Sequence, residues 1–90
     1  GSVMKSMFVI TITINENHPK DGRSFFSDKG ECIGRVLDIR KNSIDPNNVF
    51  CSYDVETTKE IYEQLENGTM KLYGLDDYTV SKSSTNYVAN

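Results

Sequence analysis

The chain has few of the residues from which metal sites and catalytic centres are built. Its single histidine, His18, and its two cysteines, Cys32 and Cys51, are too few and too widely spaced for a thiolate zinc site or a disulfide framework. Nucleophilic catalysis by a cysteine needs an adjacent base, and His18 stands before Pro19 in a run of turn formers. We therefore expect a non-enzymatic protein with a solvated histidine, reduced and partly buried thiols, no metal and no cofactor.

Long apolar runs and phosphate-binding glycine patterns are also lacking. Residues 8–14 alternate apolar residues with threonine and are far shorter than the ~20 residues of a membrane-spanning helix. No small-residue cleavage site of a signal peptide follows them. Gly30 and Gly34 match neither the dinucleotide-binding nor the P-loop spacing. The sequence therefore predicts a cytoplasmic protein without membrane contact.

Size and composition favour one small folded domain. The chain has 90 residues, of which 37% are apolar and 26% charged, and its five tyrosines and four phenylalanines can anchor a small core. Gly1-Ser2 resembles a cloning scar, so we expect a flexible start over residues 1–3. A single domain over residues 4–82 and a polar tail over residues 83–90 that is prone to fraying complete the expected organisation.

The formal net charge of −3 hides an asymmetry between the two halves. Residues 1–45 contain seven Lys/Arg and six Asp/Glu, a balance of +1, whereas residues 46–90 contain three lysines and seven Asp/Glu, a balance of −4. Neither a strongly basic nucleic-acid-binding protein nor a strongly acidic mimic of DNA is indicated.

Strand periodicity is clearest in residues 7–14. Phe8, Ile10, Ile12 and Ile14 alternate with smaller or more polar residues, which predicts a strand with one face on a core. Shorter strands are expected at residues 49–53, 70–73 and 78–82.

Residues 55–67 predict the one amphipathic helix. Their apolar side chains fall on a single stripe at helical spacing, Asp54 is a suitable N-cap, and Gly68 supplies a left-handed stop. Residues 23–41 are ambiguous. A hairpin around Asp28-Lys29-Gly30 is one interpretation, and a helix over residues 28–42 is the other. Glycines in the helix interior cost ~1 kcal/mol each, which favours the hairpin but leaves residues 28–41 open.

The predicted fold is therefore α+β. A small antiparallel sheet of about five to six strands carries one amphipathic helix (about residues 55–67) packed on one face.

The most coherent polar surface is acidic. The carboxylates of the predicted helix lie opposite its apolar stripe, and tyrosines, which are enriched in interface cores, accompany acidic residues in the next turn. The candidate protein interface comprises Glu56, Glu60, Glu63, Tyr73, Asp76, Asp77 and Tyr78.

A basic strip in the central hairpin is the alternative surface. With Phe25 and Phe26 between the charges, it would suit the backbone and bases of single-stranded nucleic acid. Its members are Arg23, Lys29, Arg35, Arg40 and Lys41.

In length and in richness of Asn, Lys, Ile and Tyr, the chain resembles the small accessory proteins of bacteriophages and mobile elements, which often block a host enzyme by occupying its surface. The leading hypothesis is a non-enzymatic protein-binding module, an inhibitor in the host cytoplasm whose partner is a larger host protein with a basic surface. Nucleic-acid binding through the basic hairpin and small-molecule binding by an oligomer are the alternatives. A homodimer through an unpaired sheet edge is a further expectation.

Overall fold

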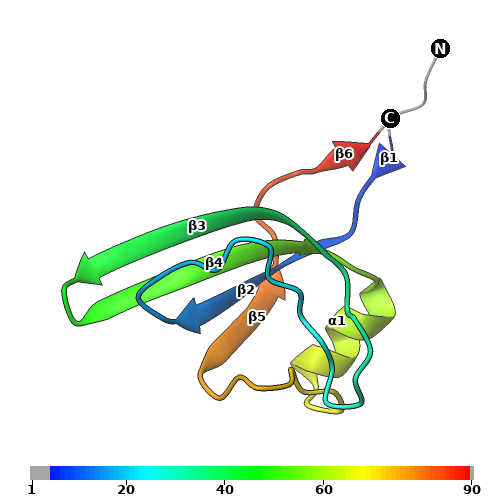
Figure 1. Cartoon of the computed structure of the whole chain (residues 1–90). Coiled ribbons are helices and arrows are strands. Elements are labelled where there is room, and N and C mark those ends of the chain that lie inside the picture. The colour runs from blue at the N-terminus through cyan, green and yellow to red at the C-terminus, as the bar shows by residue number, and fades with distance from the viewer. Residues whose placement is uncertain (1–4, 90) are drawn as a thin grey trace.

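The computed structural model describes residues 5–89. Residues 1–4 and 90, and with them the expected flexible start over residues 1–3, lie outside the described part. The elements in chain order are β1 (Lys5–Ser6), β2 (Val9–Asn15), β3 (Arg35–Asp45), β4 (Asn48–Glu56), α1 (Lys59–Glu66), β5 (Tyr78–Lys82) and β6 (Val88–Ala89). The strands form a four-stranded antiparallel sheet in the order β3-β4-β2-β5 and a two-stranded ribbon of β1 and β6 (Figure 1). This architecture confirms the predicted α+β class.

The alternation of residues 7–14 sets the register of the central strand β2. The inward residues of β2 and β4 lie opposite each other in the pairs Ile10–Val55, Ile12–Tyr53 and Ile14–Cys51. All six side chains are buried. A slip of one residue would turn the three isoleucines out of the core, so burial fixes this register.

Helix α1 begins at Lys59, whereas the sequence predicted that it would begin at Val55. Val55 is fully buried in β4, which therefore continues past the expected start of the helix. For the same reason Asp54 is not the N-cap. That role belongs to Thr58, whose side chain accepts a hydrogen bond of 3.2 Å from the backbone N–H of Ile61.

The end of α1 agrees with the prediction. Gly68, just past the helix, has φ of 83°, the left-handed conformation that glycine adopts without strain. The apolar side chains of α1 pack against the core, where the rings of Tyr62 and Phe8 lie 5.8 Å apart. Within residues 5–89, no helix is long and apolar enough to cross a membrane.

The ambiguous central segment is a tight turn followed by a long strand. Gly30, with φ of 85°, closes the turn, and the N–H of Ile33 donates to the carbonyl of Phe25 at 3.0 Å. The helix considered for residues 28–42 is therefore wrong. The predicted hairpin is only partly right, because β3 begins at Arg35 and pairs with β4 instead of with residues 23–27. The strand expected at residues 70–73 is reduced to a single bridge at Leu72.

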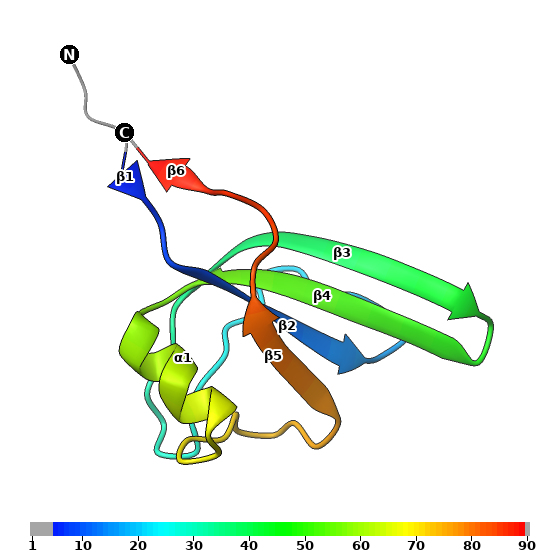
Figure 2. The same cartoon turned by 180° about the vertical axis from the view of Figure 1, so that it is seen from behind.

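One face of the sheet packs on the apolar core. We call the other, polar face the open face, although the C-terminal segment covers the part of it where Ser52 and Asp54 are buried. The connection over residues 16–34 crosses in front of β4 and β2 in Figure 1 and lies behind them in Figure 2. On the open side, the C-terminal segment runs back along the start of β2. Ser83 donates its N–H to the carbonyl of Val9 at 2.9 Å, and Met7 donates its N–H to the carbonyl of Tyr87 at 3.1 Å.

Candidate protein-binding surface

Helix α1 presents carboxylates to solvent. Glu60 and Glu63 are exposed, and the Nζ of Lys59 lies 4.0 Å from Glu63 Oε1. An exposed i,i+4 pair of this kind contributes only ~0.3–0.5 kcal/mol and is screened by salt. Glu56 lies at the end of β4, where its Oε1 is 3.2 Å from Arg35 Nη2. The charge of Glu56 is therefore compensated within the molecule.

The turn before β5 carries the other candidate residues of the acidic set. Tyr73 and Asp76 project into solvent. Asp77 is exposed as well, and its Oδ2 accepts a long hydrogen bond of 3.4 Å from the side-chain amide of Asn15, the last residue of β2. Tyr78 is half-buried, and its hydroxyl accepts a hydrogen bond of 3.0 Å from the backbone N–H of Leu72. Tyr78 thus holds the turn in place.

The structure places the end of α1 beside the turn that carries Asp76. Leu65 of α1 and Asp76 border the same open groove of about 420 Å³, so the helix and the turn are neighbours. From here on, "the acidic surface" means Glu60, Glu63 and Asp76. Residues 56–77 contain six Asp/Glu and two lysines, a net charge of −4, whereas the whole chain has −3.

The arginines of the basic strip are engaged within the molecule. Each of the three forms an ion pair, in the combinations Arg23–Glu16 at 2.7 Å, Arg35–Glu56 at 3.2 Å, and Arg40 with Asp54 at 2.6 Å and Asp38 at 3.2 Å. Lys29 and Lys41 are exposed, but they lie in different parts of the chain, one in a turn and one in β3. The charges of its three arginines are therefore compensated within the molecule, while its two lysines are exposed.

Arg23 is fixed in a mostly buried cluster beneath the 16–34 connection. Its guanidinium carbon lies 5.0 Å from the ring centroid of Tyr53 and 5.5 Å from that of Phe25. The Tyr53 hydroxyl donates to Glu16 Oε1 at 2.7 Å and accepts from the N–H of Lys20 at 2.9 Å. Burial, with the contact to Glu16, raises the pKa of Tyr53. These contacts fasten the connection to the core.

Asp54, which the sequence predicted as the N-cap of the helix, lies in β4 and accepts four side-chain hydrogen bonds. The carboxylate is fully buried on the open face of the sheet. It accepts hydrogen bonds from Arg40 Nη1 and Nη2 (2.6 and 3.1 Å), Thr11 Oγ1 (2.7 Å) and the Tyr87 hydroxyl (2.5 Å). Burial alone would raise the pKa of Asp54, but these hydrogen bonds outweigh it and lower the pKa. The hydrogen bond between the Tyr87 hydroxyl and the Asp54 carboxylate raises the pKa of Tyr87 to about 12.

A signal for this network was present in the sequence. Ser52 and Asp54 alternate with Cys51, Tyr53 and Val55, which is the period of a strand with one polar face. Extending the predicted strand through Val55 would have placed Asp54 on that face.

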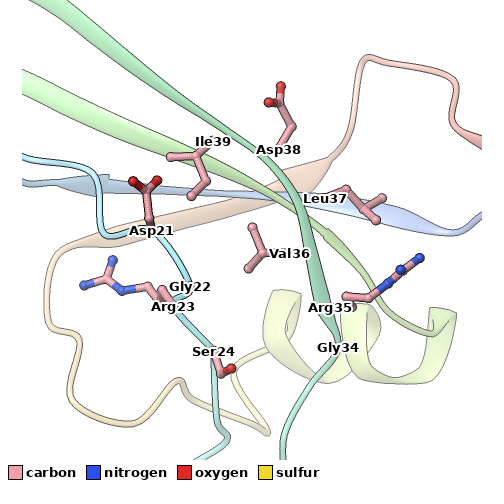
Figure 3. A pocket seen from close by; sticks show the side chains of 10 residues that line it. All are labelled: Asp21, Gly22, Arg23, Ser24, Gly34, Arg35, Val36, Leu37, Asp38 and Ile39. Atoms are coloured by element: carbon pink, nitrogen blue, oxygen red, sulfur yellow. The ribbon is translucent and has the colours of Figure 1, made fainter.

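The edge of β3 borders an open groove of about 580 Å³ (Figure 3). Val36 points toward residues 21–24 on the other side, whereas Arg35 and Leu37 point away. Exposed groups of both signs, Asp21, Asp38 and Arg35, stand at its border. The groove therefore has no preference for a ligand of one charge.

Two features reduce the suitability of the β3 edge for pairing with another strand. Its register shifts between Val36 and Asp38 and again between Ser43 and Asp45, and it carries charged residues along its length. Bulges and charges of this kind are the usual protection of an edge strand. The other outer strand, β5, is only five residues long.

The residues considered for catalysis differ in exposure. Cys51 is buried, and its burial raises the pKa of the thiol, so its nucleophilic thiolate form is disfavoured. Cys32 and His18 are exposed. Over residues 5–89, no three His, Cys, Asp or Glu side chains are grouped so that they could hold a metal ion.

Comparison of the chain with protein-family models, with curated proteins and with solved structures finds no match. The geometry and charge of the molecule itself are therefore the observations that bear on its function.

Proposed function

We propose that this chain is a non-enzymatic protein-binding module that docks on a basic surface of a larger protein through the acidic surface. The resemblance in size and composition to phage and mobile-element accessory proteins suggests that docking blocks the partner. The proposal thus describes an inhibitor that acts by occupying a surface.

One observation carries the proposal: ion pairs within the molecule compensate the arginines, while much of the acidic charge around α1 is free. All three arginines have carboxylate partners at 3.2 Å or less. Glu60 and Asp76 have no ion pair in the described part of the chain, and Glu63 has only the long contact to Lys59. A cluster of uncompensated like charge accelerates encounter with a surface of opposite charge.

The same ion pairs weaken the case for nucleic-acid binding. A phosphate would have to compete with Glu16, Glu56 and Asp54 for the three guanidinium groups. Arg23 is also held over two aromatic rings. The observations therefore favour a basic protein as the partner.

The test is a comparison of capture by two forms of the immobilised protein. The wild type is expected to retain a defined protein from a bacterial lysate at low salt and to release it at high salt, because surface charge pairs are screened within ~8–10 Å at physiological ionic strength. Glu60→Lys/Glu63→Lys is expected to lose that protein. Mass spectrometry of the eluates identifies it.

Asp21→Lys/Asp38→Lys is the matched control, because it makes the same change in net charge at exposed positions beside the groove of β3. It is expected to retain the partner. Equal retention by both double variants would contradict the assignment of the interface to α1. A dominant nucleic-acid eluate would transfer the proposal to the basic residues.

A further inference from the structure

Two exposed aromatic side chains lie side by side, one of them in the same turn as Asp76 of the acidic surface. In the described part of the chain, Phe26 is 44% exposed and Tyr73 is 76% exposed. The backbone N–H of Tyr73 donates to the carbonyl of Phe26 at 2.8 Å, so residues far apart in the sequence meet here. We call these two residues the aromatic patch.

The backbone pairing places both rings on the outer side. Ser27 and Leu72 form an antiparallel bridge, which makes Phe26 and Tyr73 the next opposite pair. Opposite residues of an antiparallel pair share a face, and adjacent residues face opposite ways. Ser27 and Leu72 are buried, so Phe26 and Tyr73 point to solvent.

The backbone beneath the aromatic patch is well fixed. Ser27 Oγ accepts hydrogen bonds of 3.2 Å from the N–H groups of Lys29 and Glu31, and the Ser27 N–H donates to the Glu31 carbonyl at 2.7 Å. Asp28 donates its N–H to the carbonyl of Lys71 at 2.8 Å, which ties the two chain segments together. A partner would therefore meet rings on an ordered backbone, which lowers the entropy cost of binding.

Charge defines the partner that the patch fits. Tyr73 belongs to the same turn as Asp76, and the segments that carry the patch, residues 26–31 and 71–77, contain four Asp/Glu and two lysines, a net charge of −2. Aromatic side chains that fill pockets provide much of the binding energy of protein interfaces, and a charged rim adds specificity and speed. The complement of this arrangement is an apolar pocket bordered by lysine or arginine.

We propose that Phe26 and Tyr73 are the apolar anchor of the binding surface, and that the partner is a protein with an apolar depression surrounded by basic side chains. This inference rests on the proposed function, since the acidic surface supplies the rim. It adds the residues that provide affinity, whereas the carboxylates provide orientation and rate.

The test uses a synthetic amphipathic helix of about 15 residues, with leucine on one face and lysine on the other, as a probe of this chemistry. Its binding to the isotope-labelled protein is followed by amide chemical shifts and by fluorescence anisotropy. The largest shifts are expected at residues 26–27 and 72–74. Tyr73→Ser is expected to weaken binding by about fivefold or more, which is a larger loss than most interface residues show.

Ile44→Ser is the matched control variant, because Ile44 is 80% exposed in β3, next to its last residue, and this end of β3 lies away from the loops that carry the patch (Figure 1, Figure 2). It is expected to bind as the wild type does. Phe26→Ser provides a second test of the patch, with the amide spectrum reporting whether the fold is kept.

Two control peptides separate the anchor from the proposed function. Failure of the leucine–lysine peptide to bind, or equal binding by a serine–lysine peptide or by Tyr73→Ser, would overturn the anchor. Binding by a leucine–glutamate peptide that equals that of the leucine–lysine peptide would contradict the acidic docking surface and leave the aromatic anchor standing.

Discussion

At the scale of single residues, Asp54 organises the open face of the sheet. Its carboxylate joins β3 through Arg40, β2 through Thr11 and the C-terminal segment through Tyr87. A buried charge that loses its partner is strongly destabilising, by ~3–5 kcal/mol, because the remaining charge is left without compensation. The network therefore constrains three separate parts of the chain at once.

Tyr87→Phe tests this network through its pH dependence. Removing the hydroxyl is expected to lower the free energy of unfolding by about 1–2 kcal/mol at neutral pH, since a hydrogen bond to a charged group is lost. Because folding raises the pKa of Tyr87, its protonated hydroxyl stabilises the folded state. This stabilisation is fully present below about pH 10, the ordinary pKa of tyrosine. This contribution is lost as the pH rises through about 12.

Urea denaturation over a series of alkaline pH values measures both effects. The decrease in stability of the wild type above pH ~10 should be smaller in Tyr87→Phe. Tyr73→Phe, at an exposed ring, is the control and should follow the wild type. Superimposable curves for the wild type and Tyr87→Phe would show that the contact to Asp54 does not stabilise the C-terminal segment.

At the scale of secondary structure elements, one close approach fixes where the central segment enters the sheet. A Cβ added to Gly34 would lie 1.9 Å from the backbone carbonyl oxygen of Glu56. Only glycine lets the chain pass the end of β4 at this distance before β3 begins.

Gly34→Ala is therefore expected to destabilise the fold by about 2–3 kcal/mol or more, as an overpacked contact against backbone cannot relax cheaply. Gly22→Ala is the matched comparison. Nothing lies within 4 Å of the added Cβ there, and only the positive φ of 74° is unfavourable. That change should cost only about 1–2 kcal/mol. Thermal or urea unfolding measures both, and equal losses would contradict the close-approach argument.

The elements also show which parts of the fold the sequence could predict. Alternation in β2 and the helix stop at Gly68 are local signals, and both elements are where they were expected. The start of α1 was misplaced because Asp54 suits a helix cap locally, and the partners that hold it in a strand come from distant positions. For the same reason, the pairing of Phe26 with Tyr73 could not be read from either segment alone.

At the scale of the whole molecule, the shape is elongated and the uncompensated charge is unevenly distributed. The molecule extends over 49 × 28 × 22 Å, with the β3–β4 hairpin at one end and the loops carrying the aromatic patch at another (Figure 1). Arginines are neutralised within the sheet and its covering connection, while the helix and the following turn keep free carboxylates. This arrangement supports the proposal that the side of α1 meets the partner.

The most direct test of that proposal is the association rate with the captured partner as a function of ionic strength. The rate constant for the wild type is expected to fall steeply with salt, and at low salt Glu60→Lys/Glu63→Lys should associate about tenfold or more slowly, because steering by opposite charge is lost. A rate that is independent of salt and unchanged in the double variant would contradict docking through the acidic surface.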